Sequence, residues 1–130
     1  MKLLLPFHLN KVGAGFPSPA TDYVEDDIDL NIHLIKNIPS TFLIRVQGKS
    51  MNKVGIHDGD LLIVDKSLNP KSFSTVIVNI NEELVVKTFV KENNQSFLTS
   101  GSKEIEDKIN LTENPEILIW GIVTYVIHAL

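Results

Sequence analysis

The chain has 130 residues, of which 43% are hydrophobic and 22% charged, the size and composition of one ordinary globular domain with a hydrophobic core. Lys and Arg number 12 against 16 Asp and Glu, and the resulting net charge of −4 argues against autonomous DNA binding, which normally uses a basic patch. Without cysteine the chain has no disulfide, thiolate nucleophile or Cys-based zinc site, which fits the cytoplasm.

Residues 1–24 show no clear apolar period, so we expect an extended, mobile N-terminal arm. Gly adds backbone freedom and Pro removes the donors that a helix needs. The apolar start of the chain ends at Pro6, too early for a secretory signal. The Gly and Pro residues of the arm include Gly13, Gly15, Pro17 and Pro19.

A short helix is predicted for residues 29–36. Asp29 is a suitable N-terminal cap, Lys36 suits the C-terminal end, and Pro39 follows the stop. The acidic run 25–27 before this helix is interpreted as a solvated face or a lead-in to the helix.

The rest of the chain is predicted to form strands, because β-branched and aromatic runs alternate with turn residues. Asn81-Glu82 is predicted to close a hairpin, although a glycine is expected at Glu82, and Gly121 is predicted to bend the last strand. That last run is also too short to cross a membrane as a helix. The predicted strands are 42–46, 61–64, 76–80, 84–90, 96–99 and 117–127.

These elements predict a mostly β fold: a compact domain of twisted, largely antiparallel strands with a short helix. We expect the arm to comprise residues 1–24 and the domain residues 25–130.

Ser50 and Lys87 are the candidate catalytic pair. Serine needs a nearby base, and lysine can serve only when it is neutral, a form that burial favours. On a strand Lys87 shares a face with Val85 and Phe89, in a run covered on both sides, so we expect it to be buried. Taken alone, an ordinary loop serine and a lysine snorkelling from a strand edge are the commoner explanation.

Other motifs carry less chemistry. Gly48-Lys49-Ser50 resembles the end of a P-loop, but Leu43 stands where the first glycine belongs and no helix pattern follows. Asp58-Gly59-Asp60 lacks the remaining ligands of a calcium loop and is interpreted as a tight turn. Four scattered histidines are interpreted as solvated or packed side chains, and we expect neither metal nor cofactor: His8, His33, His57 and His128.

The surrounding sequence resembles the LexA/UmuD family of self-cleaving Ser-Lys peptidases. The shared motifs are GKSM at 48–51, GIHDGDLLIVD at 55–65 and the lysine of VK at 86–87, in the same order and spacing. The arm, with AGFPSPA at 14–20 and DYVE at 22–25, resembles the UmuD branch. Only 14 residues precede Gly15, whereas LexA-type repressors carry a DNA-binding domain there.

The resemblance implies a LexA-like peptidase fold and names the site residues. Ala14-Gly15 would be the scissile bond, Ser50 the nucleophile and Lys87 the base. The backbone N–H of Ser50 is our candidate oxyanion donor. Cleavage is then expected to speed up as pH rises.

This sequence departs from the family pattern in two turns. Phe73-Ser74 stands where a Gly-Asp pair is usual, and Glu82 stands where a glycine is usual. These changes affect loop geometry rather than the chemistry. Residues 91–115 carry little family signal.

The resemblance also implies partners. These are a second copy of the chain in a homodimer, a RecA filament on single-stranded DNA that stimulates cleavage, and a UmuC-type polymerase that the shortened form 15–130 serves in translesion synthesis within the SOS response. No membrane and no direct nucleic-acid contact is expected. The competing hypotheses are a non-catalytic interaction module of the same fold, a LexA-like repressor fragment, and a signal-peptidase-like protease, the last weakened by the lack of a membrane anchor.

Overall fold

The computed structural model describes residues 4–8, 12–15, 24–100 and 108–130, and the chain divides into two compact units, Met1–Lys36 and Asn37–Leu130.

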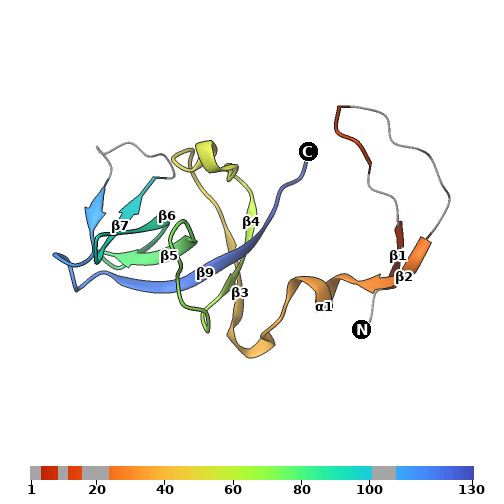
Figure 1. Ribbon diagram of the computed structural model, residues 1–130, viewed down its shortest axis with the longest axis horizontal. Coiled ribbons are helices and arrows are strands. Elements are labelled where there is room, and N and C mark those ends of the chain that lie inside the picture. Colours follow the sequence, from red (N-terminus) through yellow and green to blue (C-terminus); the bar gives the residue numbers. More distant parts are fainter. Residues whose placement is uncertain (1–3, 9–11, 16–23, 101–107) are drawn as a thin grey trace. The chain divides into compact units, whose positions relative to one another are not determined.

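The first unit holds an antiparallel strand pair followed by the predicted helix (Figure 1). Strand β1 (Leu4–His8) pairs with β2 (Val24–Asp29), and α1 spans Leu30–Leu34. The Asp29 carboxylate accepts a hydrogen bond from the Asn31 N–H at 3.0 Å, as predicted for the cap. No helix in the described ranges has the length and apolarity that crossing a membrane requires.

Residues 25–27, which we interpreted as a solvated face or a lead-in to the helix, lie inside β2, a strand that the sequence did not predict. Acidic residues are poor strand formers on their own. Here the strand forms although its residues do not favour it, because its backbone pairs with β1 from Leu4↔Asp29 to His8↔Val24. Pairing between distant segments therefore decides this element.

The second unit is built on one seven-stranded antiparallel sheet, in the order β3-β4-β9-β5-β6-β7-β8. The predicted mostly β fold is confirmed, and all six predicted strands form. Among the described strands of this second unit, only β8, two residues long, was not predicted. The strands are β3 (Thr41–Arg45), β4 (Leu61–Asp65), β5 (Thr75–Ile80), β6 (Glu83–Glu92), β7 (Gln95–Thr99), β8 (Ile109–Asn110) and β9 (Leu118–Ile127).

Two tight turns fix the register of the central hairpins. The predicted turn at Asn81-Glu82 joins β5 to β6 with φ of 51° and 65°, and Asn93-Asn94 joins β6 to β7 with φ of 50° and 64°. Positive φ at both central residues is the conformation that matches the twist of the flanking strands. The first turn places Val76 opposite Lys87.

Strand β9 is irregular on both of its sides, which lets the sheet twist and curl. Its register shifts against β4 between Ile63 and Val64, and against β5 between Ile77 and Val78. Gly121 lies at the second shift, opposite Ile77. A Cβ there would lie 2.6 Å from Cγ1 of Val64, so close packing of β9 on β4 requires the glycine.

Both faces of the central strands are packed. In β5, Ile77 belongs to one apolar cluster, and its neighbours Val76 and Val78 belong to a second. Figure 1 shows β3 and β4 running across the direction of β5 and β6. The first cluster comprises Val46, Met51, Ile56, Leu62, Val64 and Ile77, and the second Val76, Val78, Phe89, Leu98 and Ile122.

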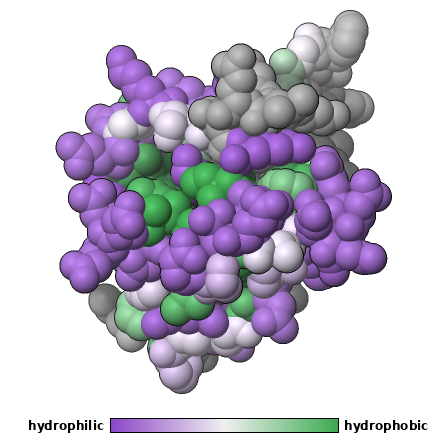
Figure 2. All heavy atoms as spheres, turned by 90° about the vertical axis from the view of Figure 1, so that its left-hand side faces the viewer, coloured by the Kyte–Doolittle hydropathy of each residue, from purple (hydrophilic) through white to green (hydrophobic). Residues whose placement is uncertain are grey.

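The second cluster is only partly covered. Side chains from β8 and the start of β9, such as Ile109 and Ile119, pack against it but remain half-buried. Figure 2 faces the end of the sheet at which β7 lies and shows apolar side chains gathered among hydrophilic ones. The first cluster is the one that supports the site described next.

Candidate active site

Ser50 lies on an exposed loop that is fixed at both of its ends. On one side Gly48 has φ of +103°, a conformation open to glycine, and its N–H donates to the Asp58 carboxylate at 2.7 Å. On the other side Met51 is 3% exposed and belongs to the first apolar cluster. The loop is therefore held by a hydrogen bond and a buried anchor, while Ser50 itself faces solvent.

The turn at Asp58-Gly59-Asp60 supports this loop, as the tight turn interpretation predicts. The Gly59 N–H donates to the Val46 carbonyl at 2.8 Å, and the Val46 N–H donates to the Asp60 carbonyl at 2.8 Å. The Arg45 guanidinium donates to the Gly59 carbonyl at 2.9 Å. These bonds tie the end of β3 to the turn that carries Asp58.

Asp60 joins the same turn to the C-terminal residues. Its buried carboxylate accepts the His57 backbone N–H at 2.8 Å and lies 2.5 Å from Nδ1 of His128. The hydrogen bond with His128, followed by that with His57, holds the pKa of Asp60 below its ordinary value of 3.8. Two histidines that are far apart in sequence thus meet at one carboxylate, which their spacing did not predict.

No group of three or more His, Cys, Asp or Glu side chains within the described residues is arranged to hold a metal ion.

Ser50 and Lys87 line one cavity of about 340 Å³. Its walls come from β3 and the following loop on one side and from residues 84–87 of β6 on the other. Strands β3 and β6 are not neighbours in the sheet. Ser50 and Lys87, 37 positions apart in the sequence, nevertheless line one cavity because the sheet curls.

Lys87 is half-buried rather than fully enclosed. Its ammonium Nζ donates a hydrogen bond to Oγ of Ser100 at 3.1 Å. Between the two described side chains of Lys87 and Ser50 there is no hydrogen bond. Ser100 was not among the residues predicted for the site, since nothing near it in the sequence marks it.

The part of β6 beside this cavity has an open edge. Strand β7 pairs with β6 only from Thr88 to Glu92, whereas β5 pairs along the whole run from Glu83 to Thr88. Among the described residues, Glu83–Val86 therefore have a neighbouring strand on one side only, while Ser100 lies beside Lys87. Such an edge can accept an extended peptide through backbone hydrogen bonds.

Ala14 and Gly15 belong to the first unit and are exposed in a bend. Val12, just before them, is 91% exposed. A peptidase can cut only a bond that enters its cleft in extended form, so exposure of this segment is the minimum that cleavage requires.

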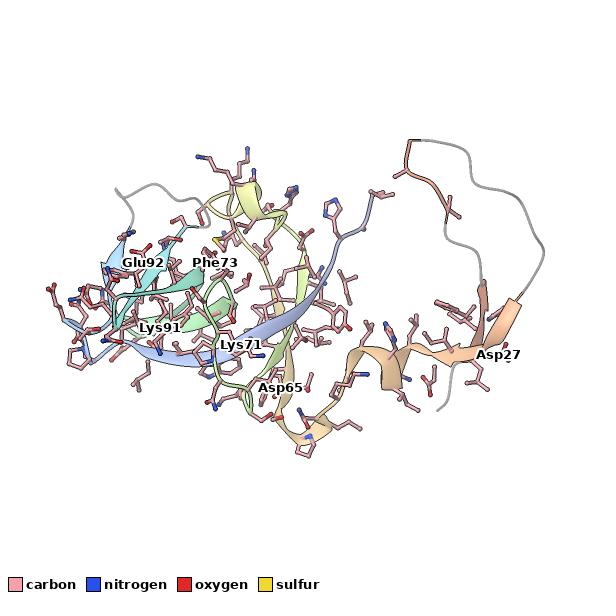
Figure 3. The ribbon with its side chains drawn as sticks, viewed as in Figure 1. Asp27, Asp65, Lys71, Phe73, Lys91 and Glu92 are labelled. Atoms are coloured by element: carbon pink, nitrogen blue, oxygen red, sulfur yellow. The ribbon has the colours of Figure 1, made fainter. Side chains whose placement is uncertain are left out.

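Asp65 marks the end of the shared motif and has a structural role. It is 4% exposed and accepts hydrogen bonds from Asn37, Ser40 and Ser67 at 2.6 to 2.8 Å. The bond from Asn37, then those from Ser67, keep the pKa of Asp65 well below its ordinary value of 3.8. Figure 3 shows Asp65 at the end of β4, where it holds the segment that leads into β3.

Phe73 stands at a position where the resemblance predicts a glycine, and its backbone adopts a conformation that is unfavourable for a residue with a Cβ. Its φ is +72°, uncommon for a residue with a Cβ, and the residue, labelled in Figure 3, is 66% exposed. The Phe73 N–H donates to the Phe89 carbonyl at 2.6 Å, and the Ser74 carbonyl accepts from the Phe89 N–H at 2.8 Å. These two bonds to β6 hold the turn in the conformation that glycine favours.

The chain has clear relatives among known proteins. Residues 6–124 match the family described as Peptidase S24-like. The chain is 41% identical over 123 residues to protein ImpA of Salmonella typhimurium, which covers 95% of this chain and 83% of ImpA. It is 34% identical over 121 residues to protein MucA of Escherichia coli, with 93% and 82% covered. With the LexA repressor of Providencia rettgeri it shares 33% identity over 92% of this chain but 58% of the repressor.

Proposed function

Starting from the fact that the chain belongs to the S24-like peptidase family and is of the UmuD type, we propose that it cuts its own N-terminal segment between Ala14 and Gly15. The observation that carries the proposal is the meeting of Ser50 and Lys87 at one cavity beside an open strand edge. The segment around Ala14 would add to the edge at Glu83–Val86 and present its backbone to Ser50.

The proposed chemistry needs only these side chains. Ser50 Oγ attacks the carbonyl carbon of Ala14 while its proton passes to the neutral amine of Lys87. Lys87 then gives this proton to the Gly15 nitrogen as the peptide bond breaks, which leaves residues 1–14 esterified to Ser50. Water, deprotonated by Lys87, hydrolyses the ester and restores both side chains.

The oxyanion of this reaction needs a donor close to Ser50. No hydrogen bond between described residues uses the Ser50 backbone N–H, which supports our choice of it as the donor. Its orientation follows from the loop, fixed by the Gly48–Asp58 bond and by Met51.

The biological setting is proposed from the same family membership. A RecA filament on single-stranded DNA would stimulate the cut in the SOS response, and residues 15–130 would then serve a UmuC-type translesion polymerase in the cytoplasm. A homodimer would be the working form. The net charge of −4 supports contact with DNA through such partners rather than directly.

The competing function is an interaction module whose dyad is idle. It is favoured by one observation: Lys87 donates to Ser100 and not to Ser50. Mass spectrometry of protein incubated at alkaline pH distinguishes the two functions. Loss of residues 1–14 that Ser50→Ala abolishes supports the peptidase, and an intact chain even with activated RecA filaments supports the module.

A further inference from the structure

Ser100 lies beside Lys87 because of the register between β6 and β7. Thr99, the last residue of β7, pairs with Thr88. Because the two strands are antiparallel, Ser100, which follows Thr99, lies next to Lys87, which precedes Thr88. Both residues are half-buried, and Nζ and Oγ are 3.1 Å apart. This is the hydrogen bond that the structure assigns to the Lys87 ammonium.

The direction of this bond suits a general base. An ammonium has three N–H donors and no acceptor, whereas a neutral amine keeps two N–H donors and gains a lone pair. A bond donated by Nζ to Ser100 therefore survives when Lys87 loses a proton. Fixing one N–H on Ser100 restricts rotation of the amine and leaves the lone pair for another partner.

Lysine has particular need of such restraint, since its charge sits on a flexible four-carbon stem. Ser50 and Lys87 share a cavity but are not hydrogen-bonded. A hydroxyl that limits the positions of Nζ raises the fraction of time in which the lone pair can reach Ser50 Oγ.

We propose that Ser100 is a positioning residue, which holds the Lys87 amine by accepting one of its N–H bonds and so aligns it to take the proton of Ser50. This inference rests on the proposed self-cleavage. It adds to the dyad a residue that directly follows β7.

The test measures the rate of self-cleavage at alkaline pH by mass spectrometry in the full chain. Ser100→Ala is expected to slow the cut by about tenfold or more, and Ser100→Thr, which keeps the hydroxyl, to restore it to within about threefold. The matched control is Ser96→Ala, a half-buried serine at the other end of β7 that is expected to leave the rate unchanged. Thermal unfolding of each variant shows whether its fold is intact.

A second measurement reports on the bond without cleavage. In the uncleavable Ser50→Ala protein, the Nζ–H signal of Lys87 in ¹⁵N NMR, assigned with Lys87→Arg, is expected to exchange with water several-fold faster once Ser100→Ala is added. A half-buried, bonded ammonium is protected from exchange, and a released one is not.

The outcomes separate the inference from the function on which it rests. A wild-type chain that stays intact overturns the proposed self-cleavage. A wild-type chain that is cut, with Ser100→Ala cutting equally fast or faster, overturns the positioning role alone, and a faster cut identifies Ser100 as a restraint that keeps Lys87 from Ser50.

Discussion

Ser50 is positioned by its neighbours in the chain rather than by contacts of its own side chain. Gly48 and Met51 fix the loop, one through Asp58 and the other through the apolar core. Lys87 in turn is bonded to Ser100. The chemistry that we propose therefore depends on residues that do not react.

Asp58 tests this dependence at the loop. Asp58→Ala removes the acceptor of the Gly48 N–H, so self-cleavage is expected to slow by about tenfold or more because the loop loses its fixed geometry. Asp58 is exposed, and the loss of stability is expected to be only about 1 kcal/mol. Asp58→Asn is the matched control, since its side-chain carbonyl still accepts the bond. Equal rates in the two variants would contradict the role of this bond.

The protonation of Lys87 sets the expected pH dependence. A lysine can accept the Ser50 proton only when it is neutral, and the neutral fraction grows as pH increases. Self-cleavage without RecA, followed by mass from mildly acidic to strongly alkaline pH, should therefore accelerate with pH, and Lys87→Arg should be inactive throughout. A flat profile would rule out lysine as the base.

At the scale of elements, the pairing of two strands can impose a left-handed conformation on turn residues that do not favour it. Asn81-Glu82 adopts the left-handed conformation at both positions although Glu82 is not glycine. The pairing of β5 with β6, from Thr75↔Thr88 to Ile80↔Glu83, imposes it. The cost stays local to the turn.

Replacing Glu82 by Gly should relieve this cost. A left-handed conformation costs a residue with a Cβ about 1 kcal/mol more than glycine, so Glu82→Gly is expected to raise the free energy of unfolding by about that amount. Asn94→Gly, at the equivalent position of the next turn, is the control and should gain less, because Asn tolerates this conformation. Chemical denaturation of both variants measures the difference, and a larger gain at Asn94 would refute the explanation.

Asp65 links β4 to the segment before β3, and its lowered pKa predicts that the stability of the fold decreases at acid pH. Its pKa is lowered in the folded protein, so the unfolded chain binds more protons between the two pKa values. Its stabilising contribution is therefore present above the ordinary value of 3.8 and is lost as pH falls from about 5 towards about 2.

Asp65→Asn is expected to lower the free energy of unfolding at pH 7 by about 2 kcal/mol and to flatten its decline at acid pH. Urea unfolding at a series of pH values tests both effects. Glu116→Gln, an exposed carboxylate near the start of β9, is the control and should change neither. An unchanged acid slope in Asp65→Asn would show that other groups carry it.

At the scale of the whole molecule, the sequence predicted what local pattern determines. Runs of β-branched residues predicted the main strands, and the Asp29 cap predicted α1. Strands β1, β2 and β8 were not predicted, because they form through pairing with distant segments rather than through their own composition.

The candidate site also has a part that the sequence predicted and a part that only the fold reveals. Ser50 and Lys87 stand in motifs that can be recognised along the chain. The bonds of Asp58 to Gly48 and of Lys87 to Ser100 depend on the turn at 58–60 and on the β6–β7 register, and no sequence spacing reveals either contact.

We propose that one chain carries both a peptidase site and the segment that it cuts, and one measurement tests this most directly. Intact mass spectrometry of the full chain incubated at alkaline pH, beside Ser50→Ala and Lys87→Ala, reports every cut. We predict a wild-type product that begins at Gly15 and ends at Leu130, with both variants left intact. A wild-type chain that keeps residues 1–14, or variants that lose them equally fast, would contradict the account.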